Sequence, residues 1–154
     1  MTDAAPGAPR VLIVDDDPAM RRFLEIALRR AGFEVAAAQS GAEAVAALIP
    51  ASPDAAPAVQ ADAVLLDAIL PDMRGYDLAR RLVGEPATAR LPICFLTGAI
   101  QGRVKADAGI ACVGKPSTPG QLVDALEAIL VGRSDYEPQE RRAAVDRVES
   151  LSLL

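Results

Sequence analysis

The sequence predicts an α/β fold in which one parallel sheet is wound on both sides by helices. Two observations predict it. Short apolar runs, typical of strands buried on both faces, alternate with longer segments whose apolar residues recur at helical spacing. Strands that alternate with helices in this way form parallel sheets. The length of 154 residues and the hydrophobic fraction of 51% suit one compact domain with a short extra segment.

The first strand and helix have clear boundaries. Residues 11–14 form a continuous apolar run that ends at the carboxylates of residues 15–17. Asp17 followed by Pro18 is a typical helix start, because Asp caps the helix and Pro fits its first position. Gly32 predicts the end of this helix.

The next elements continue the alternation. We expect a strand at 33–38, weakened by its alanines, and a helix to about residue 49 that opens with the capping box of Ser40 and Glu43. The Pro- and Ala-rich stretch 50–61 predicts a loop, and 62–67 predicts a third buried strand.

The second half repeats the pattern and then becomes polar. The predicted elements are a turn at 71–74, a helix at 75–83, a strand at 93–97, a short helix within 99–108, a strand at 110–113 and a helix at 119–131. Pro138 starts a last helix in which Val145, Val148 and Leu151 recur at helical spacing. This tail is a partly helical appendage or a docking or dimerisation helix, and its leucines favour the second.

We therefore expect a flexible lead-in at 1–9, a domain at 10–132, and a linker with a short amphipathic helix at 133–154. The net charge of −5 argues against nucleic acid as a partner. The chain shows no signal peptide and no membrane span, which predicts a cytoplasmic protein. Cys94 and Cys112 lie in apolar runs and are expected to be reduced and buried. The absence of histidine excludes catalysis by histidine.

Polar residues follow the predicted strands. Asp15 and Asp16 follow the first strand, Asp67 ends the third, Thr97 ends the fourth, and Lys115 follows the fifth. Functional groups of such sheets gather at the carboxyl ends of the strands. Three acids placed together repel unless a cation compensates them, and Mg²⁺ prefers oxygen ligands of this kind. A carboxylate is also a nucleophile that can form an aspartyl-phosphate.

These stretches, V-L-I-V-D-D-D-P, V-L-L-D-A-I-L-P-D-M-R-G, F-L-T-G and G-K-P, resemble the response-regulator receiver family over about residues 10–131. The resemblance implies a flavodoxin-like sheet of five parallel strands in the order 2-1-3-4-5. It implies that the chain is not an enzyme but a phosphoacceptor, with Mg²⁺-dependent self-phosphorylation and self-dephosphorylation.

The resemblance also assigns roles. Asp67 is implied as the phosphoacceptor, with Asp15, Asp16, Asp67 and the backbone carbonyl of Ile69 as Mg²⁺ ligands. Thr97 is implied as the switch hydroxyl and Lys115 as the cation that pairs with the phosphate. The Lys115–Pro116 peptide bond is expected to be cis. The implied donor is a phosphohistidine on a partner histidine kinase or phosphotransfer protein.

Two departures from the family concern the output surface. Cys112 stands where receivers usually have an aromatic partner for the switch hydroxyl, and the stretch from Thr97 to Lys115 is short, which predicts a shortened fourth helix. The tail is too short for a DNA-binding output domain, so we expect signalling through contact with a downstream protein. Candidate homodimer surfaces are the face of the fourth helix, fifth strand and fifth helix, and the C-terminal tail.

Two alternatives stay open. The chain could be a receiver-like adaptor that works without phosphorylation. It could also be a Mg²⁺-dependent phosphatase with an aspartate nucleophile, since Asp15 and Asp17 give the D-x-D spacing of that class, although Pro18 favours a helix start.

Overall fold

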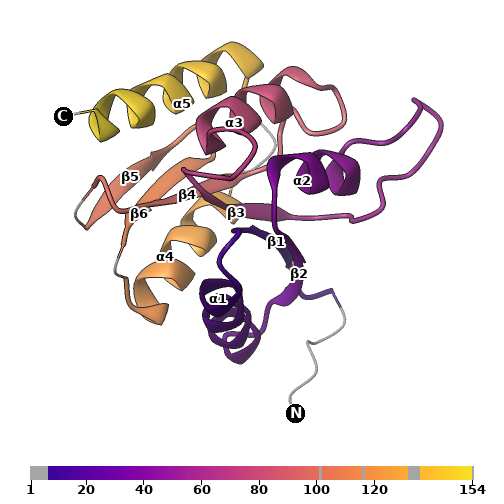
Figure 1. Ribbon diagram of the computed structural model, residues 1–154. Coiled ribbons are helices and arrows are strands. Elements are labelled where there is room, and N and C mark those ends of the chain that lie inside the picture. Colours follow the sequence, from indigo (N-terminus) through magenta and orange to yellow (C-terminus); the bar gives the residue numbers. More distant parts are fainter. Residues whose placement is uncertain (1–6, 101, 116, 132–135, 154) are drawn as a thin grey trace.

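The computed structural model describes residues 7–100, 102–115, 117–131 and 136–153, and Figure 1 shows their arrangement. The strands are β1 (Arg10–Val14), β2 (Glu34–Ala38), β3 (Ala63–Asp67), β4 (Ile93–Thr97), β5 (Arg103–Asp107) and β6 (Ile110–Gly114). The helices are α1 (Pro18–Arg30), α2 (Gly41–Leu48), α3 (Gly75–Gly84), α4 (Pro119–Leu130) and α5 (Pro138–Ser152). No helix in these ranges is long and apolar enough to cross a membrane.

The strands form one sheet in the order β2-β1-β3-β4-β6-β5. The five neighbouring strands β2, β1, β3, β4 and β6 are parallel, and they are the five strands expected from the sequence. The predicted fold class and strand order are therefore confirmed. The core lies in two halves on the two faces of the sheet. In Figure 1, α1 and α4 lie on one side of the sheet, and α2, α3 and α5 on the other.

The prediction of a short helix within 99–108 is wrong. Residues 103–107 instead form β5, an edge strand antiparallel to β6. Gly102, Ala108 and Gly109 all have positive φ angles, of 75°, 53° and 75°. Consecutive left-handed residues end a helix, and a pair of them makes the two-residue turn of a tight hairpin. The chain therefore turns back at residues 108–109 and lies on the edge of the sheet.

The predicted C-terminal helix is present as α5. Val145 and Val148 are buried in the core half that contains α3, whereas Leu151 and Leu153 remain exposed. The helix packs mainly against α3, with further contacts to β5 and β6. It thus lies on the domain itself, on the side of the sheet that carries α2 and α3 (Figure 1). The expected lead-in and linker fall largely outside the described residues.

A buried arginine fixes the first half of α5. Arg141 is 1% exposed, and its Nε donates a hydrogen bond of 3.0 Å to the carbonyl of Ala108. Its two terminal nitrogens donate to the carbonyls of Ala89 and Leu91. Burial lowers the pKa of Arg141 to about 10. A buried cation needs such partners, so these bonds determine where α5 sits.

Candidate functional site at the ends of the strands

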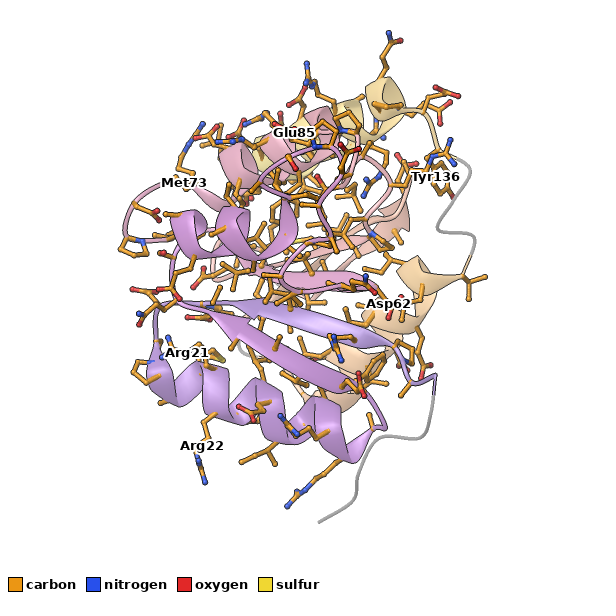
Figure 2. All side chains as sticks on the ribbon, turned by 90° about the vertical axis from the view of Figure 1, so that its right-hand side faces the viewer. Arg21, Arg22, Asp62, Met73, Glu85 and Tyr136 are labelled. Carbon is orange, nitrogen blue, oxygen red and sulfur yellow. The ribbon has the colours of Figure 1, made fainter. Side chains whose placement is uncertain are left out.

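The carboxyl ends of the parallel strands bring together the residues singled out in the sequence. Asp15 follows β1, Asp67 and Thr97 end β3 and β4, and Lys115 follows β6. The Lys115 amide donates to the Thr97 carbonyl at 2.8 Å, which continues the sheet pairing to the site. In Figure 2, Arg21 and Met73 lie at this end of the sheet, whereas Asp62 and Tyr136 lie at the opposite end.

The three aspartates form a cluster of oxygen atoms. One carboxylate oxygen from each of Asp15, Asp16 and Asp67 lies within 4.8 Å of the others. Asp15 is buried, and its Oδ2 accepts no hydrogen bond from any described residue. Burial raises the pKa of Asp15, and the charges of Asp67 and Asp16 add to the rise, against the lowering effects of the Asp17 amide and Lys115. A buried acceptor without a donor, facing two more carboxylates, fits a hard divalent cation.

Asp67 is held by a different partner on each oxygen. Its Oδ2 lies 3.1 Å from Lys115 Nζ, and its Oδ1 accepts the amide of Ile69 at 3.0 Å. Lys115 Nζ also lies 3.8 Å from Asp15 Oδ2. The ammonium therefore stands beside the two most buried carboxylates of the site.

The segment after Asp67 is shaped by a close backbone approach. A Cβ atom on Gly75 would overlap the carbonyl oxygen of Asp67 and lie 2.9 Å from the Cα of Ala68. Glycine at this position lets α3 begin directly against the end of β3, and the Gly75 amide donates to the Ala68 carbonyl at 2.8 Å. The same contact fixes the backbone that carries Asp67.

Asp72 is a second anchor of this segment, although its sequence context predicts only a turn. Its two carboxylate oxygens accept the amides of Gly41 and Ala42, each at 2.9 Å. These two amides lower the pKa of Asp72. Asp72 thus ties the segment after Asp67 to the start of α2. The sequence contains no local signal for this bond, since its partners lie about 30 residues away.

Other predicted residues have simpler positions. Asp17 accepts the amide of Ala19 at 2.9 Å, so it caps α1, as its sequence context predicts. The side chain of Ile69 is 77% exposed beside the site. Pro116, and with it the expected cis peptide bond, lies outside the described residues.

Thr97 and Cys112 meet an aromatic residue from α3. Phe95 and Thr97 are two apart on β4 and so point to the same face of the sheet, where the Tyr76 ring packs on Phe95 at a centroid distance of 4.9 Å. The Tyr76 hydroxyl hydrogen bonds to Ser152 of α5. Burial raises the pKa of Tyr76, partly offset by hydrogen bonding with Ser152 and Thr97, while Cys112 raises it further.

Cys112 itself is buried, and burial raises the pKa of its thiol to about 12. Its small side chain lies on the same core half as Tyr76. The aromatic ring beside Thr97 therefore comes from α3 and not from β6. The sequence contains no local signal for this contact, because Tyr76 and Thr97 are distant in the chain.

The comparison with known families decides the class of this site. The response regulator receiver domain model matches residues 11–127. The chain belongs to this family. Receiver domains of response regulators act in two-component signalling, as phosphoacceptors rather than conventional enzymes, and interact with histidine kinases or phosphotransfer proteins.

Curated relatives agree with the family match. The phosphate regulon transcriptional regulatory protein PhoB of Pseudomonas aeruginosa is 37% identical over 136 residues, covering 82% of this chain and 55% of that protein. The DNA-binding response regulator MtrA of Mycolicibacterium smegmatis is 37% identical over 132 residues, covering 85% of this chain and 54% of that protein. The chain thus spans about half the length of these relatives.

Solved structures agree as well. A response regulator from Chloroflexus aurantiacus has a TM-score of 0.66 and 36% identity, covering 80% of this chain and 98% of its own. The receiver domain of a sensor histidine kinase from Pseudomonas aeruginosa has a TM-score of 0.64 and 26% identity, with coverage of 80% and 98%. That structure has a magnesium ion coordinated in its active-site cleft. The aspartate cluster described above is consistent with magnesium binding.

Proposed function

We propose that this receiver accepts a phosphoryl group on Asp67 from a phosphohistidine of a partner histidine kinase or phosphotransfer protein. One observation carries the proposal. Asp67 lies 3.1 Å from Lys115 and shares a cluster of oxygen atoms with Asp15 and Asp16, at an edge of the sheet. A nucleophilic carboxylate, a cation and a set of metal ligands are the parts that phosphoryl transfer to aspartate requires.

The proposed reaction is an in-line transfer. A carboxylate oxygen of Asp67 attacks the phosphorus, the phosphorus–nitrogen bond of the donor breaks, and the leaving imidazole takes up a proton. Lys115 stabilises the negative charge on a phosphoryl oxygen, and the Thr97 hydroxyl donates a hydrogen bond to another. The product is an aspartyl-phosphate on this chain and a free histidine on the donor.

Asp15, Asp16, Asp67 and the carbonyl of Ile69 are the proposed ligands of Mg²⁺. The bound cation would offset the charges of the carboxylates and of the phosphoryl oxygens. The unpartnered Oδ2 of Asp15 supports this assignment, since it is buried and faces the cluster. The Asp17 side chain accepts the Ala19 amide and so caps α1, which disfavours the D-x-D phosphatase alternative.

Ile69 supports a proposal about the lifetime of the phosphoryl group. Its large apolar side chain lies exposed two residues after Asp67, near the expected path of an attacking water. We expect it to slow self-dephosphorylation, with replacement by Ala shortening the half-life several-fold. A half-life of seconds in the unmodified chain would contradict this expectation.

The output is proposed to act through protein contacts in the cytoplasm, with a downstream protein as the target. The predicted homodimer face consisted of the fourth helix, the fifth strand, which is β6, and the fifth helix, which is α4. This face lacks its fourth helix, because residues 103–107 form the strand β5. The adaptor alternative differs in one respect: its binding to a partner would be unaffected by Asp67→Ala.

The test is the intact mass of the protein after incubation with acetyl phosphate, with and without Mg²⁺. We expect one phosphoryl adduct that requires Mg²⁺ and is absent in Asp67→Asn, while Asp62→Asn, at the opposite end of the sheet, retains it (Figure 2). An adduct that persists in Asp67→Asn, or the absence of any adduct, would contradict the proposal.

A further inference from the structure

Helix α5 lies beside α3 and runs from one end of the sheet to the other (Figure 1). Near its start, Arg141 binds carbonyls close to the amino ends of β4 and β6. Near its end, Ser152 meets Tyr76, the second residue of α3, which lies beside the carboxyl end of β4. The last turn of α5 is therefore adjacent to the phosphoacceptor end of the sheet.

Ion pairs between α3 and α5 hold the second half of this helix. Arg80 lies 2.8 Å from an oxygen of Asp146 and 2.6 Å from one of Glu149, and Arg74 lies 2.9 Å from Glu149. These side chains are partly exposed, so each pair contributes modestly. The polar contacts of the second half of α5 are thus weaker than those of the buried Arg141 in the first half.

A chain of hydroxyl groups joins this turn to Thr97, and its direction follows from counting hydrogens. The Ser152 hydroxyl donates to the Val148 carbonyl at 3.0 Å, so its oxygen is left to accept the hydrogen of Tyr76. The Thr97 oxygen accepts the Ala99 amide at 3.1 Å and keeps its own hydrogen to donate. The Tyr76 ring packs on Phe95, on the side of the sheet to which Thr97 also points, so the Tyr76 oxygen, with its hydrogen given to Ser152, is the acceptor available to Thr97. The lowering of the Tyr76 pKa by hydrogen bonding with Thr97 agrees with this direction.

We propose that α5 is a built-in output element, whose last turn is held by the relay Thr97–Tyr76–Ser152 and is loosened when Asp67 is phosphorylated. This inference rests on the proposed function. Helix α5 then reports phosphorylation in a chain that has Cys112 at the position of the usual aromatic residue.

The physical cause is competition for one hydrogen. A phosphoryl oxygen on Asp67 is an anionic acceptor, and hydrogen bonds to anions are about twice as strong as those between neutral groups. The Thr97 hydroxyl therefore turns to the phosphoryl group, and the Tyr76 oxygen loses its donor. Hydrogen bonds in a chain strengthen one another, so the bond from Tyr76 to Ser152 weakens in turn. The last turn of α5 then opens more often.

The test is amide hydrogen exchange of residues 149–153 in the full chain, before and after incubation with acetyl phosphate and Mg²⁺. Intact mass is measured on the same samples. We expect exchange in this turn to rise on phosphorylation by up to about fivefold, the effect that complete loss of one hydrogen bond of ordinary strength would have. Exchange of α4 on the other face should not change.

Tyr76→Phe removes the hydroxyl and retains the ring on Phe95. Exchange in the last turn of this variant is expected to be raised already, with no further rise on phosphorylation, while adduct formation persists. Tyr136→Phe, which changes a half-exposed tyrosine at the opposite end of the sheet, is the matched control and should behave as the unmodified chain.

The two buried cysteines provide a second measurement. Cys112 lies in the core half under α3 and α5, and Cys94 lies in the other half. Alkylation by N-ethylmaleimide should accelerate at Cys112 and not at Cys94 when the adduct is present. Equal acceleration at both would indicate general loosening and overturn the inference.

The outcomes are separable. An adduct on Asp67 with unchanged exchange in residues 149–153 overturns the inference and leaves the proposed function intact. A phosphorylation-dependent rise that persists in Tyr76→Phe overturns the relay. Absence of any adduct overturns the proposed function and the inference with it.

Discussion

The phosphoacceptor end of the sheet and the face covered by α5 are built in different ways. At the phosphoacceptor end, backbone pairing of β1, β3, β4 and β6 sets the positions of Asp15, Asp67, Thr97 and Lys115. On the face next to α3, side chains fix the position of α5. A site built on strand ends keeps its geometry when a helix moves. A helix held by a few polar contacts can shift without disturbing the sheet.

The largest expected effect concerns the face covered by α5. Arg141→Met leaves the buried carbonyl of Ala108 and the partly buried carbonyls of Ala89 and Leu91 without their donor. We expect the free energy of unfolding to fall by about 3–4 kcal/mol, since each buried unpaired group costs about 1–3 kcal/mol. Urea denaturation measures this loss. The exposed neighbour provides the control, because Arg142→Met should change stability by less than about 0.5 kcal/mol.

The same variant tests whether the two regions are independent. Arg141→Met should still form the phosphoryl adduct at Asp67 under conditions where it is folded, because the site depends on the sheet. Loss of phosphorylation in a folded Arg141→Met protein would show that the site depends on α5 and would contradict the independence of the two regions.

The next effect concerns the phosphoacceptor end. Gly75→Ala places a Cβ against the Asp67 carbonyl, so the backbone must shift, and overpacking of this kind costs about 1–3 kcal/mol. We expect slower phosphorylation by acetyl phosphate together with this loss of stability. Gly84→Ala, at the other end of α3, meets its nearest atom at 3.5 Å and should stabilise the helix by about 0.5–1 kcal/mol. Equal phosphorylation rates in the two variants would contradict the role given to Gly75.

The smallest effect separates stability from function within the site. Asp15 has a pKa raised by burial above its ordinary value of 3.8, so the folded chain binds this proton more tightly than the unfolded chain does. Stability is therefore lost as the pH rises and Asp15 ionises. Without Mg²⁺, Asp15→Asn should raise the free energy of unfolding at pH 7 by about 1 kcal/mol.

This gain should vanish as the pH falls below about 4, where Asp15 is protonated in both states. Addition of Mg²⁺ should stabilise the unmodified chain more than Asp15→Asn. Thermal unfolding at several pH values, with and without Mg²⁺, measures both dependences. A variant that is less stable than the unmodified chain at pH 7 without Mg²⁺ would contradict the account of Asp15 as an acid that lacks its cation.

The sequence predicted most of the phosphoacceptor end because each of its residues follows a buried strand. Strand alternation and parallel topology then bring Asp15, Asp67, Thr97 and Lys115 to one edge. Local signals sufficed, such as the Asp17 cap before Pro18. The anchor formed by Asp72 was not predictable, since it depends on contact with α2.

The face covered by α5 was predicted less well, because its structure depends on contacts between residues that are distant in the sequence. Residues 99–108 contain both helix-forming and strand-forming residues, and the pairing of β5 with β6 decided between them. The helical spacing of Val145 and Val148 predicted α5, but its place beside α3 depends on Arg141 and Tyr76, whose partners are distant in the sequence. Tertiary contact, and not local pattern, determines this face.

The most direct test of the central claim locates the phosphoryl group. Borohydride reduces an aspartyl-phosphate to homoserine, and peptide mass spectrometry then identifies the changed residue. After incubation with acetyl phosphate and Mg²⁺, the account predicts homoserine at position 67 and at none of the other aspartates. Homoserine at Asp15, Asp16 or Asp17, or none after a confirmed adduct, would contradict it.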